Sequence, residues 1–473
     1  MSGHPCKEPF LDGTGRLPPT RAQSVVRHAI ETMRLAGPLA IAQLAQMAMG
    51  ITDTVLLGTL GGDALAAGGL ANSLFITVAV VLQGVLTSVS VLVSQARGAR
   101  QDARVPGLYW TGMLLVLLLV IPAFALFSGA EPMMLAVGEA PGLAHDVGVY
   151  IDVLRWGTPS ALLAIGMMRA FLPAVGQGSL ILWVSLATSL LNGLLCYGLI
   201  HGMWGLPALG LRGPALAEVA AVSAAALVLL LLVHGRPALR RFVAWRCPRA
   251  DVMGAMLRLG LPVSATFAVE TGLFFAIGLL IGLEGPIPLA AQQVALSIVS
   301  VSFMIPLAIA QAANVRVGHR IGAGDAPNAR RAGLVAIGLG GAFEGASALL
   351  LLVVPATIID LYLDPALPGN GATFAIALGL LKVAIVFQVA DGVQSVASGA
   401  LRGLGDTRVP FLLATVGYWG VGFPAAWLLT MWAGWGAAGA WWGLAASLIV
   451  VAVLLTRRFL QRSSLRPAYA PPP

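Results

Sequence analysis

The uncharged run GLYWTGMLLVLLLVIPAFALFS, residues 107–128, decides the class of fold. A helix needs about 20 predominantly apolar residues to cross the hydrocarbon core of a membrane. This run is long enough, and similar apolar runs recur along the whole chain between short polar or charged segments. Because spanning segments must satisfy their backbone hydrogen bonds internally, such runs predict helices. The sequence therefore predicts an all-α polytopic membrane protein that has the lipid bilayer as its solvent.

The composition of the whole chain agrees with this class. Of the 473 residues, 58% are hydrophobic and 10% are charged, against about 25% charged in an ordinary soluble protein. Disorder and a cytosolic enzyme are excluded, and the three cysteines do not imply a disulfide framework. The net charge of +8 comes from short basic clusters between apolar runs. That pattern indicates membrane topology and argues against nucleic acid as a partner.

The apolar runs predict about twelve transmembrane helices. They are expected near residues 35–58, 64–95, 107–128, 148–170, 179–200, 209–233, 257–283, 288–318, 331–354, 372–400, 409–431 and 436–457. The chain is thereby divided into an N-terminal tail (1–34), an N-terminal six-helix bundle (35–233), a basic linker (234–256), a C-terminal six-helix bundle (257–457) and a C-terminal tail (458–473).

Basic residues give the expected orientation. Arginines follow the second, sixth, eighth and last predicted spans, whereas acidic residues gather in the loops on the opposite side. Cytoplasmic loops carry the excess of arginine and lysine, so both termini are expected in the cytoplasm and the linker on the lipid headgroups. Residues 1–34 have no apolar stretch, which argues against a cleavable signal peptide. We expect a multi-pass protein of the bacterial inner (plasma) membrane.

The two halves of the chain repeat each other. A shift of 224 residues without a gap places Pro38 on Pro262, LAA (65–67) on LAA (289–291) and GA (98–99) on GA (322–323). Equivalent points are separated by an even number of spans, so the repeats are parallel and related by an axis along the membrane normal. This arrangement predicts two six-helix bundles around a central cleft that carries the substrate, in a protein that functions as a monomer.

Carboxyl groups inside the spans are the main candidates for chemistry, because each costs about 2.5–3.5 kcal/mol at the bilayer centre. Five acids lie there: Asp53, Glu218, Glu270, Glu344 and Asp391. Their alternative role is to hold helices together as protonated or paired groups. Acids on polar stripes in both halves favour binding of ions and organic cations. Glu344 has no polar stripe and is expected to serve helix contact.

The polar stripes follow helical spacing. On the tenth span the stripe contains Phe387, Gln388, Asp391, Gln394, Ser395 and Ser398, and this face is expected to meet water or a ligand. On the first span Gln43, Gln46 and Gly50 lead to Asp53, and the repeat pairs Gln46 with Glu270. Thr188, Asn192 and Cys196 step by four along the fifth span and are expected to face Asp53.

The absence of nucleotide-binding motifs bears on the source of energy. The sequence has neither a Walker A motif nor a GxGxxG fingerprint, and no histidine-rich metal motif. We therefore expect no cofactor, and a secondary transporter driven by an ion gradient.

Several motifs resemble the multidrug and toxic compound extrusion (MATE) family across nearly the whole chain. They are ITDT (51–54), RLGLP (258–262) with Glu270, LAAQQ (289–293), VRVG (315–318), and FQVAD (387–391) running into GALRGLGDT (399–407). Glu270 together with Asp391 is similar to the NorM-like bacterial branch. In that branch the resemblance implies that such acids bind the coupling H⁺ or Na⁺ and cationic substrates.

Departures from the family pattern bear on the coupling ion. Phe387 stands where the family often has a tyrosine beside the ion, so the lost hydroxyl weakens the case for a Na⁺ site at Glu270 and Asp391. Asp53 and Asn192 match the family's polar cluster, but Cys196 replaces a common Asn or Asp, and Glu218 replaces a threonine. An Asp53–Glu218 pair would hold one proton tightly, which suits proton coupling.

The expected function is secondary antiport of organic, cationic drugs or toxic compounds against H⁺ or Na⁺, and not an enzymatic reaction. The expected binding residues are Asp53, Glu270 and Asp391, followed by Asn192, Glu218, Phe387, Gln388, Gln394 and Gln46. The alternative is a flippase or exporter of lipid-linked or other anionic metabolites, which needs basic side chains in mid-span, such as Lys382 or Arg155. A membrane-embedded enzyme is a third interpretation, but the sequence offers no convergent histidines for it.

Overall fold

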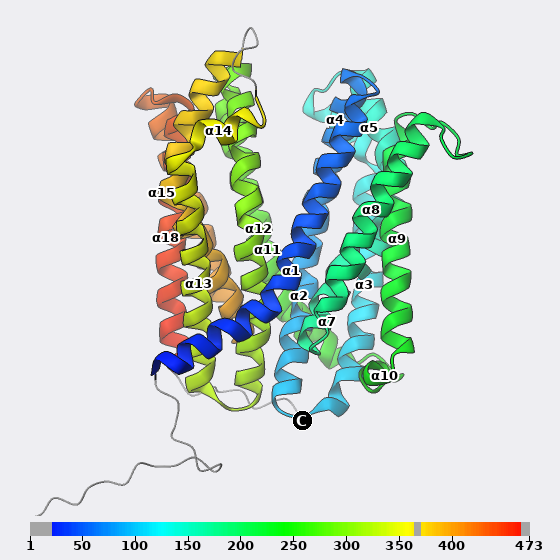
Figure 1. Ribbon diagram of the computed structural model, residues 1–473, viewed down its shortest axis with the longest axis vertical. Helices are drawn as coiled ribbons and strands as arrows, with labels where there is room; N and C mark the ends of the chain where they lie inside the picture. Colours follow the sequence, from blue (N-terminus) through cyan, green and yellow to red (C-terminus); the bar gives the residue numbers. More distant parts are fainter. Residues whose placement is uncertain (1–20, 364–369, 465–473) are drawn as a thin grey trace, which may run out of the picture.

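The computed structural model describes residues 21–363 and 370–464, and within these ranges it contains helices and no strands (Figure 1). Eleven helical segments in this part of the chain are long and apolar enough to cross a membrane. Ten of them are α1 (Arg21–Gly58), α2 (Gly62–Gly98), α3 (Val105–Ser128), α8 (Ser179–His201), α9 (Arg212–Gly235), α11 (Ala250–Gly282), α12 (Pro286–Gly322), α13 (Ala326–Val353), α15 (Asn370–Gly403) and α18 (Gly436–Ser464). The prediction of an all-α polytopic fold is confirmed.

Two further segments are helical but interrupted. The eleventh apolar segment consists of α16 (Arg408–Thr415), η4 (Val416–Gly422), α17 (Phe423–Trp427) and η5 (Leu428–Trp432), and both η4 and η5 are π-helical. The span expected near 148–170 consists of α5 (Pro141–Leu154), η2 (Arg155–Gly157), α6 (Thr158–Ala161), the π-helical η3 (Leu162–Met168) and α7 (Arg169–Ala174). Such local changes of winding re-aim side chains and are frequent at functional sites.

Short helices connect the long ones. They are η1 (Asp102–Arg104), α4 (Ala130–Val137), α10 (Pro237–Val243) and α14 (Pro355–Asp360). Helix ends differ from the expected boundaries: α1 starts within the predicted N-terminal tail, α10 and the start of α11 occupy part of the predicted linker, and α18 runs to Ser464. Residues 1–20 and 465–473 of the predicted tails lie outside the described ranges. The division into two bundles with those boundaries stays a prediction.

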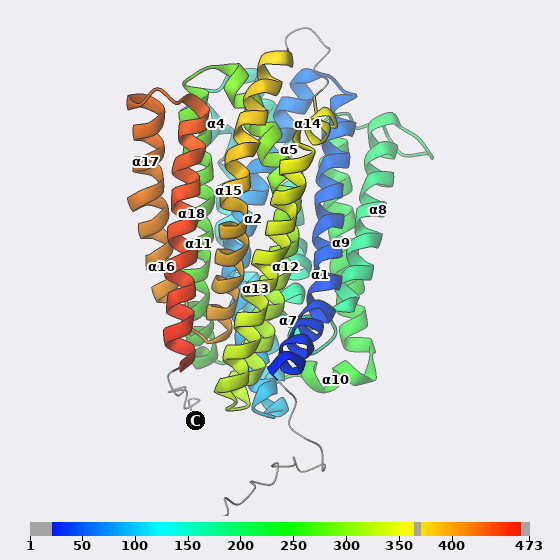
Figure 2. The same cartoon turned by 60° about the vertical axis from the view of Figure 1, so that its left-hand side comes forward.

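The helices form two groups, one of α11–α18 and one of α1–α9, which diverge toward the end where α4 and α14 lie (Figure 1). Each group has its own apolar core. Leu381, Tyr418 and Trp441 belong to one core, and Leu86 and Phe171 belong to another. Helix α1 begins, and α18 ends, at the opposite end of the molecule (Figure 2). The central cleft between the groups stays a prediction.

The two groups meet where α2 lies against α12, and this seam has the symmetry of the repeat. Asn314 donates a hydrogen bond to Ser90, its own counterpart 224 residues away, at 3.4 Å. A Cβ added at Gly98 would lie 1.9 Å from His319 O, and one added at Gly322 would lie 2.0 Å from Gln95 O. The 224-residue offset seen in the sequence therefore relates the two sides of a close backbone contact.

A second symmetric pair ties the same seam to the ends of α7 and α15. Gln95 Nε2 donates to Gly403 O at 3.1 Å, and the ring Nε2 of His319 hydrogen bonds to Ala174 O at 3.0 Å. Both acceptors are at the last residue of their helices, where carbonyl groups lack an intrahelical partner. The seam thus satisfies backbone groups that the fold would otherwise leave unpaired.

Arg316 forms a further set of contacts, between α12 and the start of α1. Arg316 of α12 donates to Glu31 Oε2 at 2.6 Å and to the main-chain oxygen of His28 at 2.6 Å, and it also contacts Thr32. Only the helical start of α1 before the predicted first span makes these contacts. The residues expected in the N-terminal tail therefore hold α1 against the other group of helices.

Candidate functional site

The C-terminal group of helices brings two of the predicted acids together. The amide Nε2 of Gln394 donates to Glu270 Oε1 at 3.1 Å and to Asp391 Oδ1 at 3.3 Å. Asp391 is 7% exposed, and within the described ranges neither acid forms a salt bridge. Asp391 and Gln394 share one face of α15 because they are three residues apart, and α11 supplies Glu270 across from them. A buried carboxyl group, that of Asp391, and a half-buried one, that of Glu270, thus share one neutral donor.

Tyr418 and Arg402 border this pair, and sequence reasoning singled out neither. The Tyr418 hydroxyl, from the π-helical η4, lies near Glu270 and has no hydrogen-bond partner within 3.5 Å. Trp419, the next residue, donates from its indole to Val269 O at 3.1 Å and so fixes this segment beside Glu270. Arg402 is 9% exposed, interacts electrostatically with Glu270 and lies 5.4 Å from the centroid of the Phe267 ring. The LRG run around Arg402 offered the signal that could have marked it.

Glu344 forms a second buried site next to the first. It is 1% exposed, and neither of its carboxyl oxygens has a hydrogen-bond partner within 3.5 Å. Its polar neighbours come from other helices: Ser302 of α12 and Gln388 of α15, with Asp391 in electrostatic contact. Gln388 donates to Ser302 at 2.9 Å and to Ser347 at 3.1 Å, while its own Oε1 is unpaired.

The polar stripe of the tenth span lies inside the protein. Phe387, Gln388 and Ser395 are all buried, so the stripe does not face open water, and its contact with a ligand stays a prediction. Phe387 packs on Trp441 with ring centroids 5.8 Å apart. The stripe is polar because it faces neighbouring helices that also carry polar groups.

The N-terminal group holds the other predicted acids. Asn192 Nδ2 donates to Asp53 Oδ1 at 2.6 Å, and the thiol of Cys196 lies beside the same carboxyl group. Glu218 of α9 interacts electrostatically with Asp53, and Tyr150 of α5 lies near both acids. The structure therefore brings Asp53, Asn192, Cys196 and Glu218 together, as the four-residue spacing along α8 predicts for Asn192 and Cys196.

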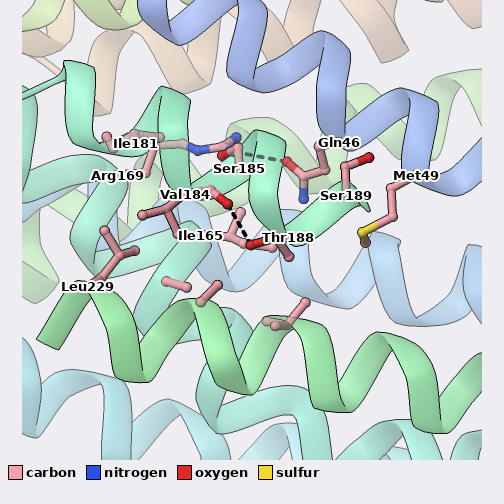
Figure 3. Close-up of a pocket in the computed structure, with 13 residues that line it drawn as sticks. Gln46, Met49, Ile165, Arg169, Ile181, Val184, Ser185, Thr188, Ser189 and Leu229 are labelled. Carbon is pink, nitrogen blue, oxygen red and sulfur yellow. Dashed lines mark hydrogen bonds between the residues drawn. The ribbon is translucent and has the colours of Figure 1, made fainter. Parts of the chain in front are cut away.

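Gln46 lies elsewhere. Arg169 donates to Gln46 Oε1 at 3.0 Å (Figure 3) and to Gln43 Oε1 at 2.6 Å. The polar stripe of α1 is therefore divided, with Gln43 and Gln46 on Arg169 and Asp53 on Asn192. Thr188 also faces this region, where it donates to Val184 O at 2.7 Å. Sequence reasoning missed Arg169, although an arginine in an apolar span is itself a signal.

The fold and these sites define a class: a polytopic α-helical membrane protein of two related halves, each of which buries carboxyl groups among its helices. The chain belongs to the MatE family, whose model matches residues 38–198 and 262–428. The two matches begin at Pro38 and Pro262, the pair of prolines aligned by the 224-residue repeat. The resemblance to the MATE family is confirmed.

Similar proteins agree with this membership. A protein of Burkholderia mallei named "Probable multidrug resistance protein NorM" is 55% identical over 455 residues, which are 96% of each chain. The "Multidrug resistance protein NorM" of Burkholderia vietnamiensis is 53% identical over 456 residues, 96% of this chain and 98% of that one. A solved structure of an outward-facing multidrug resistance MATE family transporter superposes with a TM-score of 0.84 at 19% identity, covering 94% of this chain and 99% of that one.

Proposed function

We propose that this chain is a multidrug efflux transporter of the inner membrane that exports organic cations in exchange for H⁺ or Na⁺. The bridge from Gln394 to both Glu270 and Asp391 carries the proposal. A buried and a half-buried carboxyl group that lie together without a salt bridge are stabilised when a proton, a metal ion or an organic cation neutralises them. The names of the NorM relatives support export of drugs.

Competition for the same carboxyl groups couples the two movements. When the coupling ion occupies Glu270 and Asp391, these acids no longer attract a cationic compound, and the compound leaves. When the compound binds, it displaces the ion. The ion gradient then drives net exchange, because each conformation of the transporter binds either the coupling ion or the compound more tightly.

The N-terminal acids favour protons as the coupling ion. Asp53 and Glu218 interact with each other, and Asp53 already accepts from Asn192. Two adjacent carboxyl groups disfavour joint ionisation, so the pair retains a proton. In the C-terminal site the carboxylate oxygens are also the ligands that a hard cation such as Na⁺ prefers, so Na⁺ at Glu270 and Asp391 remains the competing proposal.

Orientation belongs to the same proposal. The arginine-rich ends of α2, α9 and α12 lie at the end of the molecule where α1 begins and α18 ends (Figure 1). Cytoplasmic loops carry the excess of basic residues. This supports cytoplasmic termini and a direction of export away from that side, by a protein that acts as a monomer.

The test is efflux of a fluorescent organic cation from proteoliposomes under a sodium gradient or a proton gradient alone. Glu270→Gln and Asp391→Asn remove charge at the site. Glu284→Gln and Asp360→Asn are matched controls, since both of these acids are exposed near helix ends. We expect loss of efflux with the first two variants only, and efflux under one gradient. Efflux that survives both site variants, or that follows neither gradient, refutes antiport through these acids.

The flippase alternative rests on buried basic side chains. Arg169 and Arg402 are such residues, and Lys382 and Arg155 are those that the sequence suggested. Arg402 already interacts with Glu270 and with the Phe267 ring, so its charge has partners within the protein. Export of an anionic lipid with no efflux of cations would favour the flippase over the proposed antiporter.

A further inference from the structure

Arg169 is a buried cation without an acidic partner. Its side chain is 92% hidden, since the residue is 8% exposed. Two of its nitrogens donate to the neutral amide oxygens of Gln43 and Gln46, and Nε has no hydrogen-bond partner. Among residues 21–363 and 370–464, no carboxylate forms a salt bridge with it and no charged group perturbs it. Arg402, the other deeply buried arginine, differs because it interacts with Glu270.

This arrangement leaves a charge that the protein does not balance. Burying one ion costs several kcal/mol even after relaxation, and amide dipoles return only part of that energy. A guanidinium presents five donors in a planar fork that matches small anions and carboxylates. An anion from outside the chain would supply the missing charge and accept from the remaining terminal N–H groups of the guanidinium.

A cavity lies beside the guanidinium. It has a volume of about 40 Å³ and is lined by Arg169, Gln46, Ser185, Thr188 and Ser189 together with apolar side chains (Figure 3). Thr188 and Ser189 donate to the main-chain oxygens of Val184 and Ala45. Ser185 has no hydrogen bond to any described residue, so its hydroxyl is free to donate into the cavity. One water molecule needs about 10–15 Å³ of such space, so the cavity has room for a small anion.

We propose that this cavity binds a small monovalent anion, held by the Arg169 guanidinium and the Ser185 hydroxyl. The anion is either a free halide or the carboxylate group of a transported compound. Both offer one negative charge and hydrogen-bond acceptors of the right size. The proposal concerns binding and does not depend on which ion drives transport.

The test is the thermal unfolding of the full-length purified protein in potassium chloride, potassium formate or potassium methanesulfonate at equal ionic strength. Methanesulfonate is the reference because it is the bulkiest of the three anions. A ligand that binds only the folded state raises Tm with a saturable concentration dependence. We expect such a rise with chloride, with formate or with both, and none with Arg169→Gln.

Two further variants make the test independent of the stability of Arg169→Gln. Ser185→Ala removes one donor to the anion and should raise the half-saturating concentration about tenfold. Ser189→Ala is its matched control on the same helix, because the Ser189 hydroxyl is already used by Ala45 O. A wild-type protein without any saturable rise, or a Ser185→Ala variant that matches Ser189→Ala, overturns the proposal.

The source of the anion is separated by transport. A compound that carries both a cationic group and a carboxylate is compared with its methyl ester. If the carboxylate belongs in the cavity, Arg169→Gln lowers transport of the acid at least tenfold and leaves the ester unchanged. If a free halide belongs there, both compounds respond equally to the variant and both depend on chloride. If the protein transports neither compound but its Tm still rises with the anion, the proposed antiport is refuted and the anion site is supported.

Discussion

The seam between the two groups of helices permits a sharp prediction. A Cβ at Gly98 would lie 1.9 Å from His319 O. Ordinary van der Waals contact therefore requires the α2 and α12 backbones to separate by about 1.5 Å. Overpacking of this kind costs about 1–3 kcal/mol. The same amount of energy shifts an equilibrium between closed and open seams by about 5- to 150-fold.

The assay reports opening of the seam. Ser90 is buried at the contact with Asn314, so a cysteine at position 90 reacts with a thiol reagent only when the seam opens. In a background without the native cysteines, we expect Gly98→Ala to speed labelling by a factor in that range. Gly107→Ala is the control, because no atom lies within 4 Å of a Cβ added there.

The symmetric variant Gly322→Ala sharpens the test. Its Cβ would lie 2.0 Å from Gln95 O, across the same contact. Once one alanine has separated the helices, the second finds space, so the double variant should cost clearly less than the sum of the single variants. Labelling that does not change in either variant, or energies that simply add, would refute the idea of one shared seam.

Three further predictions follow from single contacts. Glu344→Gln should leave Tm unchanged or higher, because neither carboxyl oxygen has a partner to lose; a clear drop in Tm would mean that the charge is needed. Asn192→Ala removes the donor to Asp53 and should cost about 1–3 kcal/mol of stability, measured by chemical unfolding, and an unchanged stability would contradict this. Arg316→Ala frees the start of α1, so amide hydrogen exchange over residues 25–34 should rise at least tenfold, whereas unchanged protection would show that packing alone holds this helix.

The fold was predictable because its signals are local and repeated. Apolar runs identify spans one at a time, and the 224-residue offset requires only that small residues recur where backbones touch, as Gly98 and Gly322 do. Two features escaped prediction. The start of α1 is amphipathic and charged, so its helix is fixed by Arg316, which is remote in sequence. The broken span from α5 to α7 depends on π-helical winding that no apolar pattern reveals.

The site was predictable only where both partners lie on regularly spaced stripes. The spacing of Asn192 and Cys196 along one helix pointed to Asp53, and the structure brings them together. The polar surroundings of Glu344 could not be predicted, because its polar neighbours, Ser302 and Gln388, come from other helices. Arg169 was missed for the same reason, since its partners lie more than a hundred residues away in α1.

The repeat is preserved where helices touch and lost where charges are buried. Ser90 meets Asn314 and Gly98 mirrors Gly322 across the seam, yet Gln46 in one half corresponds to Glu270 in the other. Close backbone contact demands small residues on both sides, so symmetry there is a packing requirement. A buried charged residue is under no such packing requirement, so the two halves can carry different charged residues at equivalent positions.

The consequence is a difference in electrical character between the halves. The C-terminal half has Glu270 and Asp391 joined by Gln394, and it suits a positive ligand. In the N-terminal half, Asp53 interacts with Glu218. Arg169, which has no acidic partner, donates to Gln46, the counterpart of Glu270. Under the two proposals made above, equivalent positions attract opposite charges, and a compound with both a cationic and an anionic group is recognised at two places in one protein.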